Sequence, residues 1–140
     1  MKQLDNFMRV DFLSKSANEG FARMAVAAFI SQLDPTISAV AEIKTAVSEA
    51  VTNSIVHGYE GVTGYVTLTC QWSGNLVTVT VEDKGRGISD ITMARTPLFT
   101  TKPEHERSGM GFTVMENFMD SVEVYSKPME GTKVVMVKKL

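Results

Sequence analysis

Two polar residues, Glu49 and Asn53, are the first in the chain that could act together on a ligand. They are four positions apart, so on a helix both side chains project from one side. A carboxylate can accept a proton, and an amide oxygen can ligate a hard cation. Such a pair on its own is most often a solvated helix face, so a functional interpretation needs support from elsewhere in the chain.

A second candidate group, Asp83, Gly85 and Gly87, directly follows a segment rich in Val and Thr. Two glycines two positions apart allow unusual backbone dihedrals and let a flat ligand approach closely. Asp83 could accept a hydrogen bond from an amino group of that ligand. The alternative is an ordinary Asp/Gly turn.

A third group, Gly109, Met110 and Gly111, opens a helical segment. The N-terminus of a helix offers free N–H groups and a favourable dipole to anions, and glycines leave room for phosphates. The alternative is a flexible loop end. Thr132 follows Gly131 at the start of the last strand, and this pair alone indicates no more than a turn.

The elements that must position these residues follow from hydrophobic periodicity. Alternation predicts strands at 7–13, 65–72, 76–81, 121–125 and 132–137, with a hairpin turn at 73–75. Three- and four-residue spacing predicts helices at 16–33, 37–57 and 109–119. The predicted fold is α+β, a two-layer sandwich with helices on one face of a mostly antiparallel sheet.

Local signals refine these elements. Ser16 and Glu19 have the spacing of a capping box, and Asp34 with Pro35 should end the first helix. The second helix is expected to bury an apolar stripe that Lys44 interrupts, namely Ile37, Val40, Val47, Val51 and Ile55. Cys70 shares a strand face with hydrophobic residues and is expected in the core.

Bulk composition describes an ordinary globular chain. Its 140 residues fit one domain, and its net charge of -2 gives no reason to expect a nucleic-acid or membrane partner. One cysteine excludes an internal disulfide. We find no signal peptide and no apolar segment long enough to span a bilayer, so we expect a soluble cytoplasmic protein.

The joint order of the motifs resembles the ATP-binding fold shared by DNA gyrase, heat-shock protein 90, histidine kinases and MutL, the Bergerat-type fold. That order is Glu-x-x-x-Asn on a helix, Asp-x-Gly-x-Gly after a strand, Gly-x-Gly before a helix, and Gly-Thr. The resemblance covers about residues 44–132. It implies ATP bound between the helices and a flexible lid at about 90–108.

Several segments narrow the resemblance to the bacterial anti-sigma serine kinases, and within them to the sporulation type that acts on sigma F. These segments are residues 49–53, 57–59, 97–104, 106–112 and 115–120. The N-terminal residues 21–23 and 33–36 fit the same family, so the resemblance extends nearly end to end.

The resemblance implies roles around the nucleotide. Glu49 would be the general base, and Asn53 would ligate Mg²⁺ beside the phosphates. Asp83 would bind the adenine amino group, and Thr132 would reach the adenine directly or through water. The base pocket and the phosphate-binding N–H groups would come from the glycine motifs, namely Gly85, Gly87, Gly109, Met110 and Gly111.

Three basic residues have implied roles that leave alternatives open. Lys102 or Arg107 would cover the terminal phosphate, and bidentate pairing favours Arg107. The alternative for both is a solvated charge on the lid. Arg23 would contact both the sigma factor and its antagonist, whereas without the family it would simply be an exposed helix arginine.

The implied protein is a cytoplasmic homodimer that uses ATP and Mg²⁺. It would hold a sporulation sigma factor away from RNA polymerase and phosphorylate a serine of its anti-anti-sigma antagonist. Two alternatives stay open. One is an ATPase clamp in which Glu49 activates water, and the other is a nucleotide-gated sigma-binding module without catalysis.

Overall fold

The structure is a computed structural model that describes residues 3–88, 91, 95 and 111–140. Its strands are β1 (Asn6–Leu13), β2 (Tyr65–Ser73), β3 (Leu76–Asp83), β4 (Ser121–Lys127) and β5 (Gly131–Lys139). Its α-helices, among the described residues, are α1 (Ala17–Ile30), α2 (Ile37–Asn53) and α4 (Gly111–Phe118). A 3₁₀ turn (Ser31–Leu33) follows α1, and a π-helical turn (Ser54–Gly58) follows α2.

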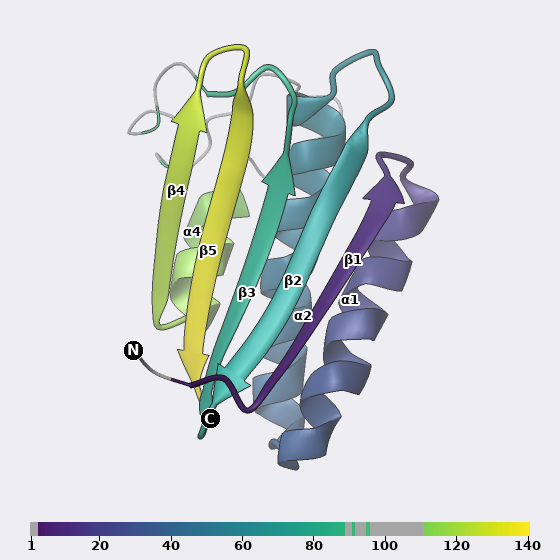
Figure 1. The fold of residues 1–140 in the computed structure, drawn as a ribbon. Helices are drawn as coiled ribbons and strands as arrows, with labels where there is room; N and C mark the ends of the chain where they lie inside the picture. The colour runs from purple at the N-terminus through teal and green to yellow at the C-terminus, as the bar shows by residue number, and fades with distance from the viewer. Residues whose placement is uncertain (1–2, 89–90, 92–94, 96–110) are drawn as a thin grey trace.

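The five strands form one antiparallel sheet in the order β1-β2-β3-β5-β4, and the three helices cover one face of it (Figure 1). This architecture confirms the predicted α+β two-layer sandwich. The C-terminal ends of α2 and β3 and the β4–β5 turn all lie at the same end of the molecule (Figure 1). The residues of interest are therefore brought to one end of the sandwich.

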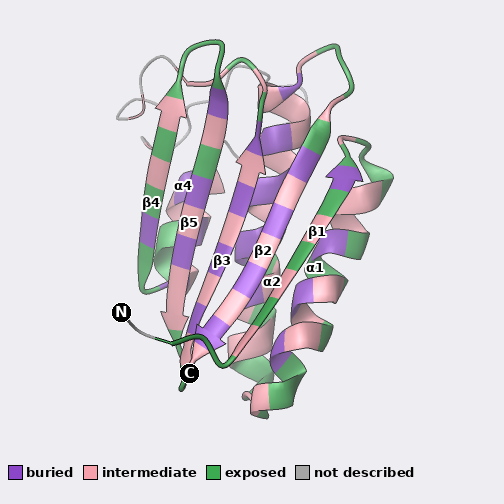
Figure 2. Ribbon diagram, viewed as in Figure 1, coloured by how far each residue is buried: buried purple, intermediate pink, exposed green. Residues whose placement is uncertain are grey.

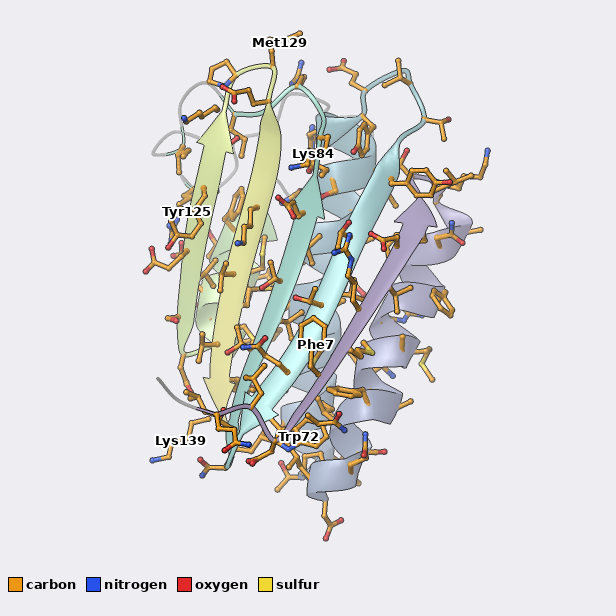
Figure 3. The ribbon with its side chains drawn as sticks, viewed as in Figure 1. Phe7, Trp72, Lys84, Tyr125, Met129 and Lys139 are labelled. Carbon is orange, nitrogen blue, oxygen red and sulfur yellow. The ribbon has the colours of Figure 1, made fainter. Side chains whose placement is uncertain are left out.

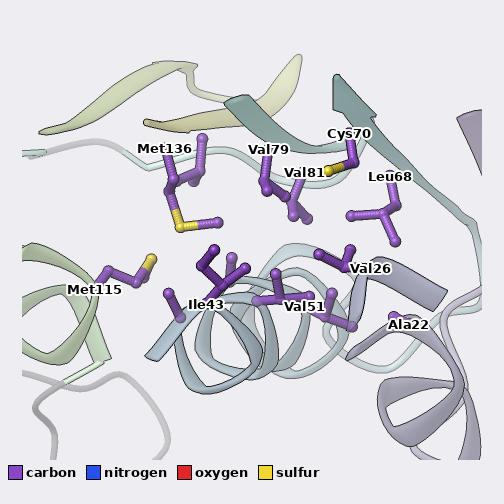
Figure 4. Packing of buried hydrophobic residues seen from close by; sticks show 14 of the residues in the cluster. Ala22, Val26, Ile43, Val51, Leu68, Cys70, Val79, Val81, Met115 and Met136 are labelled. Atoms are coloured by element: carbon purple, nitrogen blue, oxygen red, sulfur yellow. The ribbon is translucent and has the colours of Figure 1, made fainter. Parts of the chain in front are cut away.

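The sheet alternates between buried and accessible residues as the sequence predicts (Figure 2). A strand places successive side chains on opposite faces, so one face can be apolar while the other meets water. The inner face packs on the helices, and Cys70 is fully buried there, as expected (Figure 4). The hydrophobic residues of β2 and β3 on this face are Val66, Leu68, Cys70, Trp72, Val77, Val79 and Val81.

The predicted apolar stripe of α2 is only partly right. Val47 and Val51 are buried, but Ile37 is 90% exposed because the first helical turn is not covered by the packed layer. The buried stripe starts later and runs at spacings of three and four, through Ile43, Ala46, Val47, Ala50 and Val51. Thr36 caps this helix, since its side chain accepts the Ala39 N–H at 3.1 Å.

The capping box predicted at Ser16 is wrong. Ser16 has a helical backbone (φ -54, ψ -33) and makes no side-chain capping hydrogen bond. An N-cap residue normally has an extended backbone that aims its oxygen at the first free N–H groups, and Ser16 lacks that conformation. The α-helix itself ends at Ile30, but the helical stretch continues through the 3₁₀ turn and ends at Leu33 as predicted. Asp34 turns into the left-handed region (φ 52) just before Pro35.

Candidate nucleotide-binding site

Asp83 is the last residue of β3 and continues its inward-facing row. The preceding members of that row are buried hydrophobic residues, whereas Asp83 is a carboxylic acid that is only 3% exposed. Burial raises the pKa of the Asp83 carboxyl above its usual value of 3.8. A buried ionisable group needs hydrogen-bond partners, so its surroundings indicate what it does.

Three protein groups donate to this carboxyl and oppose the effect of burial on its pKa. The Gly85 N–H donates to Oδ1 at 2.9 Å. Hydrogen bonds from the Ser54 hydroxyl and the Thr132 N–H also lower the pKa of Asp83. We call Asp83, Ser54, Gly58, Gly85 and Thr132 the Asp83 cluster.

Glycines in and beside the Asp83 cluster allow backbone and side chains to approach closely. A Cβ at Gly58 would lie 2.9 Å from the Asp83 carboxylate, and one at Gly85 would lie 2.0 Å from the Gly58 carbonyl oxygen. A Cβ at Gly87 would lie 2.0 Å from the Lys127 carbonyl oxygen. Gly85 and Gly87 therefore pack the Asp-x-Gly-x-Gly loop between the end of α2 and the β4–β5 turn.

The π-helical turn after α2 brings two members of the cluster to Asp83. The Tyr59 N–H donates to the Ser54 carbonyl at 3.0 Å, an i→i+5 bond that widens the last turn. The sequence predicted a helix to about residue 57 but not this change of pitch. π turns occur frequently at functional sites, and this one holds both Ser54 and Gly58 against the carboxylate.

Tyr59 anchors the loop from the other side. Its buried hydroxyl accepts the Lys84 N–H at 2.7 Å and donates to the Tyr65 carbonyl at 2.6 Å. Lys84 lies just past the end of β3 (Figure 3), and the backbone on both sides of it, at Asp83 and Gly85, is thus tied to β2. Tyr59 lies in a segment whose sequence resembles the family, but no role was predicted for it.

A row of hydroxyls extends the polar end of the inner sheet face. The strand register places Thr132 opposite both Asp83 and Ser126. The Ser126 and Thr132 hydroxyl oxygens are 2.7 Å apart, and the Ile88 N–H donates to Ser126 Oγ at 2.8 Å. Ser126 was missed from sequence. The available signal was its place in the inward-facing row of β4, in phase with Val122 and Val124.

A second group of predicted residues meets where α2 approaches α4. Gly111 begins α4, and a Cβ there would lie 3.3 Å from Glu49 Oε2 and 3.4 Å from Asn53 Nδ2. We call Glu49, Asn53 and Gly111 the Glu49 cluster. Asn53 and Ser54 are consecutive, so the end of α2 carries both clusters, one toward α4 and the other toward β3.

Other predicted residues lie elsewhere. Lys102, Arg107, Gly109 and Met110 are outside the described residues, as is nearly all of the predicted lid. Arg23 is on α1, which lies on the other side of α2 from α4 (Figure 1). It is exposed and pairs with Glu19 at 3.5 Å, so it belongs to neither cluster.

A separate cavity of about 260 Å³ lies at the opposite end of the sandwich, between the α1–α2 connection and the β2–β3 turn. It is lined by Leu33, Asp34, Pro35, Thr36, Ala39, Gly74, Asn75 and Leu140. It contains none of the residues predicted to bind a ligand.

The oxygen atoms near Glu49 suit Mg²⁺, which needs few ligands from the protein. No group of three or more His, Cys, Asp or Glu residues that could hold a metal occurs in the part of the chain that is described. Mg²⁺ does not need such a group in a nucleotide site, because it is usually held by one or two protein oxygens, phosphates and water. The Asn53 amide oxygen beside the start of α4 fits that description.

The sequence matches known proteins over nearly its whole length. The family profile of the histidine kinase-like ATPase domain matches residues 13–138. An anti-sigma F factor of Clostridium perfringens is 59% identical over 138 residues, which are 98% of this chain and 99% of that protein. This chain belongs to the anti-sigma F factor family.

Further relatives support the same membership. An anti-sigma F factor of a Thermoanaerobacter species is 60% identical, with 95% of this chain and 93% of that protein covered. A crystal structure of the RsbU and RsbW domains of a Mycobacterium tuberculosis protein has a TM-score of 0.72 and 17% identity, covering 96% of this chain and 32% of that chain. At that identity the likeness shows the fold alone.

This member of the anti-sigma F factor family carries a histidine kinase-like ATPase domain, which is an ATP-binding type of domain. Among the described residues, no helix combines the length and apolar character needed to cross a membrane.

Proposed function

We propose that this protein binds ATP with Mg²⁺, inhibits a sporulation sigma factor, and phosphorylates a serine of its anti-anti-sigma antagonist. The observation that carries the proposal is the meeting of both clusters on the last turns of α2. One cluster presents a buried acceptor suited to an amino group, and the other joins a carboxylate and an amide to a helix N-terminus.

The Asp83 cluster supports adenine recognition. The carboxylate of Asp83 is an acceptor, and the exocyclic amino group of adenine is a donor. A 6-oxo purine would instead present an oxygen to the same carboxylate, which is unfavourable. Thr132 lies opposite Asp83 in the neighbouring strand, and we expect its hydroxyl to contact the base or a water on it.

The Glu49 cluster supports phosphoryl transfer. The serine oxygen of the antagonist forms a bond to the γ-phosphorus, and the bond from that phosphorus to the bridging oxygen breaks. The electron pair of the broken bond leaves with ADP, and the serine proton passes to the Glu49 carboxylate. A positioned general base is worth roughly 10²–10⁴ in rate.

The N-terminus of α4 and the Asn53 side chain would stabilise the negative charge of the phosphates. N–H groups at the start of a helix favour anions, and the glycine at position 111 keeps Cβ atoms away from that space. Bound Mg²⁺ would neutralise phosphate charge, with the Asn53 amide oxygen as its protein ligand.

The partner assignments rest on the family. Relatives that are 57–60% identical over nearly the full chain are named anti-sigma F factors. We therefore propose a sigma F-type partner, an anti-anti-sigma substrate, a homodimer, and a cytoplasmic location alongside the transcription machinery. Arg23 is exposed on α1 and is available for either protein partner, although it now pairs with Glu19.

The test is incubation of the protein with radiolabelled ATP, Mg²⁺ and a purified anti-anti-sigma protein, followed by detection of labelled phosphoserine. Label on a serine of the partner is the expected result. ATP binding without label, together with nucleotide-dependent sigma binding, would instead indicate a binding module. Phosphate release without any protein substrate would indicate an ATPase clamp.

A further inference from the structure

The Asp83 carboxylate already accepts hydrogen bonds from the protein. The Gly85 N–H donates to Oδ1 at 2.9 Å, and hydrogen bonds from the Ser54 hydroxyl and the Thr132 N–H lower the pKa of the carboxyl. An ionised carboxylate offers about four lone-pair positions on its two oxygens, so it can also accept from an amino group of a ligand.

Among these donors, Ser54 is the only side chain. The Gly85 N–H belongs to the loop after β3, and the Thr132 N–H belongs to β5, so backbone geometry fixes both. The backbone does not fix the direction of the Ser54 hydroxyl, which can turn about its Cβ–Oγ bond. The hydrogen bond to Asp83 sets that direction, in a residue that is only 5% exposed.

The π-helical turn holds Ser54 in that place. The Ser54 carbonyl accepts the Tyr59 N–H at 3.0 Å, which defines the widened turn. Gly58, at the other end of the turn, has no side chain, and a Cβ there would be 2.9 Å from the carboxylate. The widened turn and the absence of a side chain at Gly58 together allow the end of α2 to lie close to the Asp83 carboxylate.

We propose that Ser54 is a positioning residue, whose hydroxyl fixes the rotation of the Asp83 carboxylate so that its remaining lone pair faces the 6-amino group of a bound purine. The inference rests on the proposed function, since it requires a purine nucleotide in this site. Ser54 has one hydroxyl proton and gives it to Asp83, so it acts through Asp83 and not on the nucleotide.

The test compares two nucleotides on three proteins. ATP and purine riboside triphosphate, which is ATP without the 6-amino group, are titrated with Mg²⁺ into wild type, Ser54→Ala and Ser54→Thr by calorimetry. Ser54→Ala should weaken ATP binding about tenfold, or 1.4 kcal/mol, because the carboxylate is no longer held in one orientation. Binding of the desamino analogue should be unchanged, and Ser54→Thr, which keeps the hydroxyl, should keep most of the ATP affinity.

Matched variants separate positioning from a general loss of structure. Ser38→Ala changes an exposed serine in the first turn of α2, the helix that ends just before Ser54, and should leave both affinities unchanged. In an Asp83→Asn background, Ser54→Ala should no longer change the ratio of the two affinities. This second comparison keeps the test valid even where a single variant loses stability.

Other results would overturn the inference. Equal weakening of ATP and the analogue by Ser54→Ala would show a structural role only, and no weakening of either would show no role. Wild type that fails to bind ATP would refute the proposed function itself. Wild type that binds ATP, with Ser54→Ala behaving identically, would refute only the role of Ser54.

Discussion

Glu49 is the residue on which the proposed chemistry depends most. Its carboxylate lies beside Gly111 at the start of α4, where a terminal phosphate would be bound. Glu49→Gln keeps the shape and removes the base, so phosphate transfer to the antagonist should fall roughly 10²–10⁴-fold. ATP affinity should stay within a few-fold of wild type, measured on the same preparations.

Glu42→Gln is the matched control for that experiment. Glu42 is on the same helix and faces Lys138 at 3.9 Å, away from the Glu49 cluster. This variant should transfer phosphate at the wild-type rate. Wild-type transfer by Glu49→Gln would contradict the assignment of Glu49 as the base.

Asp83 and Asp11 should titrate on opposite sides of the usual Asp value. Burial raises the pKa of the Asp83 carboxyl above 3.8, whereas hydrogen bonds from Thr67 and Arg9 lower the pKa of the exposed Asp11. An NMR titration of the side-chain carboxyl carbons measures both in one sample. A pKa of Asp83 at or below that of Asp11 would contradict the buried environment described above.

The sign of the effect on stability follows from the same shift. Folding favours the protonated Asp83, so this residue adds most to the free energy of unfolding at low pH. Its contribution is lost as the pH rises through the folded pKa, which lies above 3.8. An amino donor from ATP would favour the ionised form, so we expect ATP to lower the pKa of Asp83 in the same titration.

At the residue level, spacing predicted much of the site but not all of it. Asp83, Gly85 and Glu49 belong to motifs with a fixed spacing between residues, and such motifs can be recognised in a single sequence. Ser54 and Ser126 belong to no such motif, although Ser126 follows the inward-facing row of β4. Ser54 reaches Asp83 through the π turn, and Ser126 reaches Thr132 through the β4–β5 register, and both features form only in the folded chain.

At the level of elements, Gly87 and Gly61 make a matched pair of loop glycines. Their φ angles are nearly equal, at 75° and 74°, but only Gly87 has the Lys127 carbonyl within reach of a new Cβ. Gly61→Ala should cost about 1–2 kcal/mol for the left-handed conformation alone. Gly87→Ala should cost clearly more, because it adds a backbone clash at 2.0 Å.

Urea denaturation without nucleotide measures both glycine variants. The difference between them isolates the close packing of the Asp-x-Gly-x-Gly loop against the β4–β5 turn. Equal destabilisation by the two substitutions would mean that conformational freedom, and not close packing, is what position 87 requires.

The strands could be predicted more fully than the helix ends. Alternation over 65–72 and 76–81 fixed which residues of β2 and β3 face the helices, since a one-residue slip would bury Thr and expose Val. The cap expected at Ser16 failed because its backbone is already helical. The π turn at Ser54–Gly58 has no periodic signature, because apolar spacing does not distinguish one wide turn from an α-helical end.

At the level of the whole molecule, two protomers are expected to associate. The chain mass is 15.4 kDa, so light scattering on the eluted peak of a sizing column should give about twice that value. A monomer at concentrations where sigma binding is complete would remove the dimer from the proposal. It would leave the nucleotide site unaffected, because both clusters come from one chain.

The central claim is that ATP binds where the two clusters meet, and calorimetric titration of ATP-Mg²⁺ into wild type and Asp83→Asn tests it most directly. The account predicts saturable one-to-one binding by wild type and at least tenfold weaker binding by Asp83→Asn, about 1.4 kcal/mol, with the fold intact by circular dichroism. Equal affinity of the two proteins for ATP would place the adenine elsewhere and contradict the account.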